Sequence, residues 1–243
     1  ISVGIINASY FISGQTNQGI DFFCRYCSGA TAINFLRFYN IIDIDFVEKC
    51  LKTGSVKLDL EKLQKSRSNL YAGVTHLHNG KGVLLDVKQV WSGLITAIKA
   101  SIAVEGLYGK SVAINGERFI DGMLALPFPI QEVIERFNPT DVLVMANCYK
   151  EQQDDILFQT ERLLSQIFFG FFPPIINTHI QSREKKFKEA LKYIKTLKNI
   201  NLMIVWALNN ELRLSTTDQL KLKKATAQSQ EQMFDIFNKT YSG

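Results

Sequence analysis

The chain lacks an apolar run long enough to span a membrane, a low-complexity linker and an internal repeat. It also lacks a dense block of lysine and arginine, although its net charge is +5. Scattered positive charge suits attraction to anionic surfaces such as lipid head groups, and it makes nucleic acid an unexpected partner. A chain of 243 residues can bury a sizeable core. We therefore expect one globular domain over residues 1–243.

Histidine and cysteine are scarce, with three of the first and four of the second. Cys24 and Cys27 form C-x-x-C without a second pair, which favours buried thiols over a zinc site. Such thiols indicate a reducing compartment, in the cytoplasm or at a membrane periphery. His76 and His78 share one face of an expected strand but have no evident third ligand, so no metal is expected. The scarcity of histidine also disfavours a Ser-His-Asp hydrolase.

Strands alternate with helices in the outer parts of the chain, and this order predicts an α/β fold. Two hairpins are expected, because Asn79-Gly80 and Asn115-Gly116 each separate two short apolar runs. The run at 141–146 is typical of a central parallel strand. The expected strands are residues 69–77, 82–85, 111–114, 118–120, 141–146 and 202–206. The expected helices are residues 3–13, 45–51, 59–63, 86–100, 129–136, 155–168, 182–198, 217–223 and 228–238, with shorter pieces within 22–39.

Ser2-Val3-Gly4 runs directly into an apolar helical segment, as the second half of a G-x-S-x-G nucleophile elbow does. In such an elbow, a serine on a tight strand-to-helix turn exposes its hydroxyl, and the flanking glycines avoid collisions. The following helix directs its N-terminal N–H groups at the place where negative charge develops. The leading glycine of the motif would precede Ile1, and the chain does not start with Met. We therefore expect the protein's N-terminus, with any targeting signal, upstream of Ile1.

Further motifs follow this opening in a definite order. Asn7-Ala8 continues the serine segment, Ala100-Ser101-Ile102-Ala103 ends a helix, and Phe119-Ile120-Asp121-Gly122 follows an Asn-Gly turn. Pro127-Phe128-Pro129 and the strand at 142–146 come next. In this order, and over most of its length, the chain resembles the patatin-like phospholipase family. The C-terminal part, with Pro173-Pro174, the basic helix at 183–198 and the strand from 202, looks most like the bacterial branch.

The resemblance implies a three-layer α/β/α sandwich with a mainly parallel central sheet, here lacking the first strand and the oxyanion loop. It implies a Ser-Asp dyad in which Ser2 is the nucleophile and Asp121 the general base, with Val3, Gly4 and Gly122 supporting the elbow and the oxyanion. A carboxylate within hydrogen-bond reach activates the serine hydroxyl and later a water molecule. The implied activity is acyl-ester hydrolysis of glycerolipids or phospholipids, with peripheral membrane contact and without a metal or organic cofactor.

Some features depart from the family pattern and keep other readings open. Glu105 stands where the family usually has proline, and Met123 stands where a small residue is usual. The Gly-rich oxyanion loop would lie upstream of Ser2, and losing one oxyanion donor typically costs about 10²–10³ in rate. The alternatives are a catalytically silent module that binds lipid or protein, and an acyltransferase with the same dyad.

Two local features also have plainer interpretations. Asp121-Gly122 by itself would be an ordinary turn, in the way that Asp86 reads as a helix cap and Asp141 as a strand-entry residue. The aromatic cluster at Phe168–Phe172 is expected to pack in the core at a helix end, although a membrane-inserting loop would have the same composition.

Overall fold

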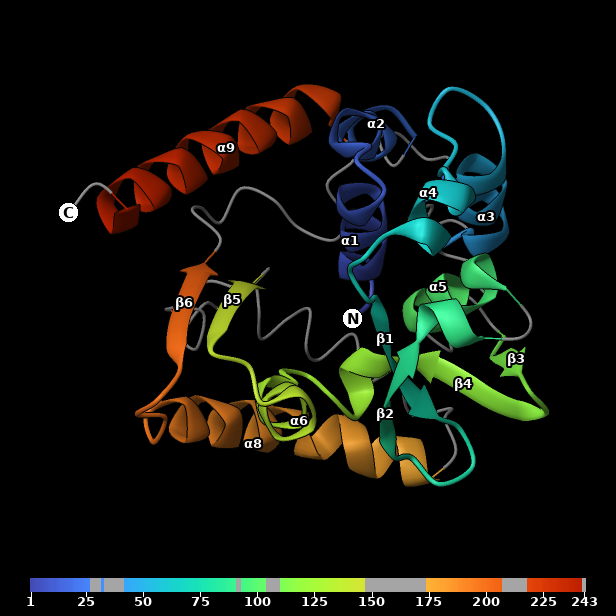
Figure 1. Cartoon of the computed structure of the whole chain (residues 1–243). Helices are drawn as coiled ribbons and strands as arrows, with labels where there is room; N and C mark the ends of the chain where they lie inside the picture. The colour runs from blue at the N-terminus through green and yellow to red at the C-terminus, as the bar shows by residue number, and fades with distance from the viewer. Residues whose placement is uncertain are drawn as a thin grey trace.

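The computed structural model describes residues 1–26, 32, 42–90, 93–103, 110–146, 174–206 and 218–241. It is a mixed α/β structure, as the alternation of strands and helices predicts (Figure 1). The strands are β1 Tyr71–His76, β2 Gly82–Asp86, β3 Val112–Ile114, β4 Glu117–Asp121, β5 Asp141–Ala146 and β6 Asn201–Trp206. The helices are α1 Gly4–Ile12, α2 Thr16–Asp21, α3 Ile44–Lys52, α4 Leu60–Lys65, α5 Leu94–Ile102, α6 Ile130–Phe137, α8 Pro174–Ile194 and α9 Gln219–Tyr241. Short helical turns are η1 Phe22–Tyr26, η2 Val87–Gln89 and η3 Gly122–Leu124.

The larger sheet has four strands in the order β2-β1-β4-β3, and every neighbouring pair is antiparallel. Both Asn-Gly hairpins are confirmed. At the second hairpin, Asn115 has φ 53° and Gly116 has φ 85°, the pair of positive angles that a tight two-residue turn requires. The register of the central pair places Val74 of β1 opposite Asp121 at the end of β4.

The second sheet is the parallel pair β5–β6, which lies apart from the four-stranded sheet in Figure 1. Parallel strands are usually covered on both faces. On β5, however, Leu143 is 46% and Met145 68% exposed. Among the described residues this is the single parallel pairing. The three-layer sandwich with a mainly parallel central sheet therefore stays a prediction.

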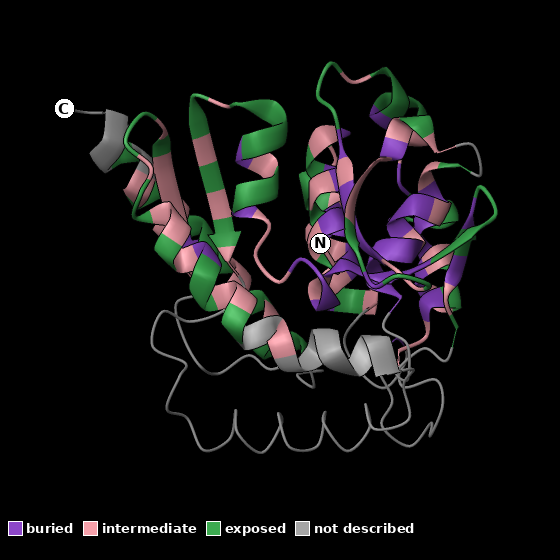
Figure 2. Cartoon of the chain, turned by 90° about the horizontal axis from the view of Figure 1, so that it is seen from below, coloured by how far each residue is buried: buried purple, intermediate pink, exposed green. Residues whose placement is uncertain are grey.

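Most buried side chains surround the four-stranded sheet and the helices α1, α3 and α5. Ile5, Val74 and Ile98 are representative, each with at most 1% of its surface exposed. In Figure 2 the buried residues gather in this half of the molecule, whereas the β5–β6 half is largely intermediate or exposed. A smaller cluster of Ile130, Ile134 and Ala190 joins α6 to α8. Among the helices of the described residues, none combines the length and the apolar character that a membrane crossing requires.

Several expected helix boundaries are wrong for local reasons. Asp86 does accept a hydrogen bond from the Lys88 N–H (3.0 Å), but it caps only the short turn η2. The main helix, α5, starts only after Gly93, because a φ of 101° is incompatible with a helix that runs through this residue. Asp43 rather than Asp45 caps α3, through the N–H of Phe46 (2.8 Å).

The two helices expected near the C-terminus are one continuous helix, α9. It begins directly after Asp218, whose carboxylate accepts hydrogen bonds from the N–H groups of Leu220 and Lys221 at 2.9 and 3.2 Å. Some predictions lie outside the described residues: those on Cys27, Glu105, the helix at 155–168, the Phe168–Phe172 cluster and most of the pieces within 22–39.

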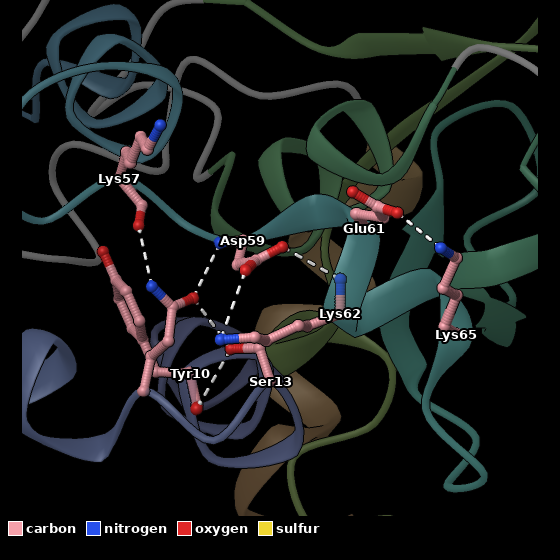
Figure 3. A network of polar contacts seen from close by, with 8 residues as sticks. Tyr10, Ser13, Lys57, Asp59, Glu61, Lys62 and Lys65 are labelled. Atoms are coloured by element: carbon pink, nitrogen blue, oxygen red, sulfur yellow. Dashed lines mark hydrogen bonds and ion pairs between the residues drawn. The ribbon is translucent and has the colours of Figure 1, made fainter.

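A polar network fixes the C-terminal end of α1, the helix that follows Ser2 (Figure 3). The side chain of Gln15 accepts hydrogen bonds from Ser13 Oγ (3.0 Å) and the Asp59 N–H (2.6 Å). Its amide group also donates to the Lys57 carbonyl (3.0 Å). Tyr10 OH donates to the carbonyl of Val56 in the same segment. Three of these hydrogen bonds therefore tie the end of α1 to the residues that lead into α4, and the fourth, from Ser13, holds the Gln15 side chain in place.

An ionic network joins α3 to α5. Lys99 Nζ lies 2.6 Å from both Asp45 Oδ1 and Glu48 Oε2, and Glu48 Oε1 also accepts from Lys52 (2.5 Å). The hydrogen bonds from Lys52 and Lys99 hold the pKa of the Glu48 carboxyl below its usual range, against the smaller opposing effect of burial. Because the folded-state pKa is lowered, this carboxylate stabilises the fold above its unfolded pKa. The stabilisation is lost as the pH falls through the folded pKa.

Glu48→Gln should therefore lower the free energy of unfolding by about 1 kcal/mol at pH 7. The gap between the variant and the wild type should narrow below about pH 4 and close as the pH falls through the lowered folded-state pKa, where the wild type also loses the carboxylate charge. Urea unfolding at a series of pH values measures this gap. Glu61→Gln is the control, since Glu61 pairs with Lys65 on the exposed surface. A gap that stays constant down to pH 3 would contradict the prediction.

Candidate active site

Ser2 lies in a tight turn at the entry to α1. Its φ is 51°, in the left-handed region that residues other than glycine rarely adopt. The Gly4 N–H donates to the Ile1 carbonyl and the Ile5 N–H to the Ser2 carbonyl, both at 3.1 Å, so the turn leads directly into the helix. A strained backbone at a serine before a helix is the geometry of a nucleophile elbow.

The glycine that is closely packed near Ser2 is Gly73 rather than Gly4. A Cβ added to Gly4 would meet no heavy atom within 4 Å among the described residues, so their packing does not require glycine there. Crowding is found at Gly73 of β1 instead. A Cβ there would lie 2.6 Å from Ile1 Cγ1, because the side chain of Ile1 packs directly over this strand.

Asp121 ends β4 and is fully buried. Its N–H donates to the carbonyl of Ala103, just after α5 (2.9 Å). Its Oδ1 accepts from the Met123 N–H (2.8 Å), so the carboxylate also caps η3. Asp121 thus caps a turn, as the Asp of an Asp-Gly pair ordinarily does. Unlike an ordinary turn residue, it is buried and lies next to β1.

β1 brings the regions of Ser2 and Asp121 together. Ile1, the residue before Ser2, packs on Gly73, and Asp121 pairs with the next residue, Val74. In Figure 1 the N-terminus accordingly lies beside β1. The contacts of β1 therefore hold Asp121 close to the residue that precedes Ser2.

Gly122 and Ser101 complete the packing around Gly73. A Cβ on Gly122 would lie 2.3 Å from the Gly73 carbonyl oxygen, so the residue after Asp121 rests directly on the β1 backbone. Ser101 Oγ donates to the same oxygen (2.8 Å). The sequence motifs included Ser101 and Gly122 but missed Gly73. A glycine inside an apolar strand, which often marks a close backbone approach, was the available signal.

The histidine and cysteine residues do not form a metal site in the described parts of the chain. The rings of His76 and His78 are 6.4 Å apart, and His76 Nε2 lies 3.5 Å from Glu117 Oε1. No group of three or more potential ligands gathers there. Cys24 and Cys50 are buried thiols, and burial raises the pKa of Cys50 against the smaller opposing effect of Lys49.

Comparison with known proteins shows a distant relationship. No model of a protein family matches the chain. It is 27% identical over 200 residues to the uncharacterized protein YjjU of Escherichia coli (strain K12), an alignment that covers 80% of the chain and 54% of YjjU. The chain thus spans about half the length of this relative. Because the name of this relative states no activity, the functional argument rests on the chemistry of the site.

Proposed function

We propose that the chain is part of a patatin-like lipid acyl hydrolase in which Ser2 is the nucleophile and Asp121 the general base. The observation that carries the proposal is the left-handed φ of Ser2 at the entry to α1. This conformation costs free energy of about 1–3 kcal/mol, and strain of this kind is concentrated at active sites. The neighbourhood of Asp121, reached through Gly73 and Val74, supports the second role.

The reaction proceeds in two steps. Asp121 accepts the proton of the Ser2 hydroxyl while Oγ attacks the ester carbonyl carbon, and the collapsing tetrahedral intermediate expels the alcohol, which takes the proton. Asp121 then accepts a proton from water as the water oxygen attacks the acyl-enzyme, and it returns this proton to Ser2 Oγ as the intermediate collapses and the fatty acid leaves. Neither step needs a histidine, a metal or an organic cofactor.

The N-terminus of α1 supports stabilisation of the oxyanion. In an elbow the N–H of the residue after the nucleophile is an oxyanion donor, and that residue is Val3. Among the described residues, no group accepts a hydrogen bond from the Val3 N–H. The positive end of the nine-residue helix α1 adds to the favourable potential. The remaining donors belong to a Gly-rich loop that the resemblance places upstream of Ser2.

The proposal includes the finer features of the family. In this proposal, the parallel pair β5–β6 is part of the mainly parallel sheet of a three-layer sandwich, and its exposed Leu143 and Met145 leave room for a further layer. The substrate is a glycerolipid or phospholipid, which the protein reaches as a peripheral membrane enzyme. The net positive charge supports attraction to an anionic lipid surface.

A fluorophosphonate probe tests this proposal directly, because it reacts covalently with activated serines. We expect the full-length protein to incorporate the probe at Ser2, as mapped by mass spectrometry of the labelled peptide, and to release fatty acid from phosphatidylcholine vesicles. Labelling of Ser2 without fatty-acid release into water would favour an acyltransferase. Absence of labelling and of release would favour the catalytically silent module and reject the hydrolase.

A further inference from the structure

We propose that Thr75, near the C-terminal end of β1, is a positioning residue that holds Asp121 for catalysis. This inference rests on the proposed function of Asp121. Thr75 is fully buried. Its Oγ1 donates a hydrogen bond to the Asp121 carbonyl (2.8 Å) and accepts one from the Ala125 N–H (3.2 Å). One hydroxyl therefore contacts both ends of the turn that carries the proposed base.

The two hydrogen bonds fix the turn η3 to the sheet. Asp121 precedes this turn and Ala125 follows it. Within the turn, Asp121 Oδ1 accepts from the Met123 N–H, so the direction of the carboxylate depends on the path of the backbone from Gly122 to Leu124. A change in that path would rotate the carboxylate even if β4 itself stayed in place. The Thr75 hydroxyl thus restrains the geometry on which proton transfer depends.

Sheet pairing alone does not supply this restraint. The register of β1 and β4 ends at the pair Val74–Asp121, and the Asp121 N–H donates to Ala103 rather than to β1. The Thr75 side chain instead extends the attachment of β1 beyond the last pair, to Ala125. Gly73, two residues earlier on the same strand, packs against Ile1 beside Ser2. Both halves of the proposed dyad are therefore positioned from one short segment of β1.

Thr75→Val keeps the shape of the side chain and removes the hydroxyl. We expect kcat for the hydrolysis of p-nitrophenyl butyrate to fall by about 10- to 100-fold, because small misplacements of a reacting group carry costs of this size. KM should change little, since Thr75 is buried and does not contact substrate. Thr75→Ser retains the hydroxyl and should restore most of kcat.

The experiment compares these variants of the full-length protein with Tyr10→Phe, which removes another buried hydroxyl that donates to a carbonyl, that of Val56. Kinetics are combined with amide hydrogen exchange at Met123 and Ala125. The proposal predicts that Thr75→Val lowers kcat and speeds exchange at both amides, that Thr75→Ser does neither, and that Tyr10→Phe loses stability while keeping kcat. Unchanged kcat in Thr75→Val, an equal loss in Tyr10→Phe, or no rescue by serine would overturn it.

The same experiment separates failure of this inference from failure of the proposed function. If Ser2→Ala hydrolyses the ester as fast as the wild type, the hydrolase proposal is wrong. Exchange at Met123 and Ala125 then still decides whether Thr75 holds the Asp121 turn. Unchanged exchange in Thr75→Val would refute the positioning role in that case as well.

Discussion

Asp121→Asn should slow ester hydrolysis by about 10²- to 10⁴-fold, the usual contribution of a positioned general base. Asparagine has nearly the same shape and keeps an oxygen that can accept the Met123 N–H, so the turn at η3 retains its cap. What it loses is the ability to take a proton from Ser2. Ser2→Ala should remove turnover by the acyl-enzyme route altogether. Initial rates of fatty-acid release from phosphatidylcholine vesicles measure both effects.

The double variant distinguishes a dyad from two unrelated contributions. Residues that act as one unit have non-additive effects, so Ser2→Ala/Asp121→Asn should be no slower than Ser2→Ala alone. Asp141→Asn is the matched control, because Asp141 lies at the exposed start of β5 and bonds to Thr140 and Asn201. Full activity of Asp121→Asn, or an equal loss in Asp141→Asn, would reject Asp121 as the base.

Gly122→Ala should destabilise the fold by about 3 kcal/mol or more, at the upper end of the usual overpacking cost. The added Cβ would lie 2.3 Å from the Gly73 oxygen, 2.4 Å from the Gly73 carbonyl carbon and 2.8 Å from the Val74 nitrogen. These are backbone atoms of a central strand, and Ser101 Oγ also holds the Gly73 oxygen in place. The strand cannot yield as a flexible side chain would, so the turn after Asp121 must move.

Gly4→Ala provides the contrast in the same neighbourhood. A Cβ at this first helical residue meets no heavy atom of the described chain within 4 Å, and alanine favours helix over glycine. We expect a change of less than about 1 kcal/mol, in the stabilising direction. Urea unfolding followed by circular dichroism measures both variants. Similar unfolding free energies for Gly122→Ala and the wild type would show that the close packing on β1 is not required.

Short sequence patterns correctly predicted those parts of the fold that depend on neighbouring residues. The Asn-Gly pairs define both hairpins, and Gly14 with φ 71° ends α1 as expected. The interruption at Gly93 was missed because the apolar spacing continues across it, and spacing does not report the sign of φ. The cap of α3 was misplaced by two residues because Asp43 and Asp45 are equally good caps in isolation.

The proposed site, like the fold, has residues that local sequence predicts and residues that it does not. Ser2 and Asp121 could be named from short motifs, since each motif is contiguous in the chain. The residues that place them could not, because Gly73 and Thr75 act through contacts with Ile1, Asp121 and Ala125, which are distant in sequence. A threonine in a strand has no local feature that reveals a hydrogen bond to a turn far along the chain.

The dependence of the site on β1 has a consequence for folding during synthesis. The segment that carries Ser2 leaves the ribosome first, β1 follows, and β4 with Asp121 emerges much later. Contacts between such distant segments close long loops and form slowly. The proposed dyad therefore cannot assemble until β4 has paired with β1. Under the proposed function, a nascent or partly folded chain would carry the serine without its base and would be inactive until folding is complete.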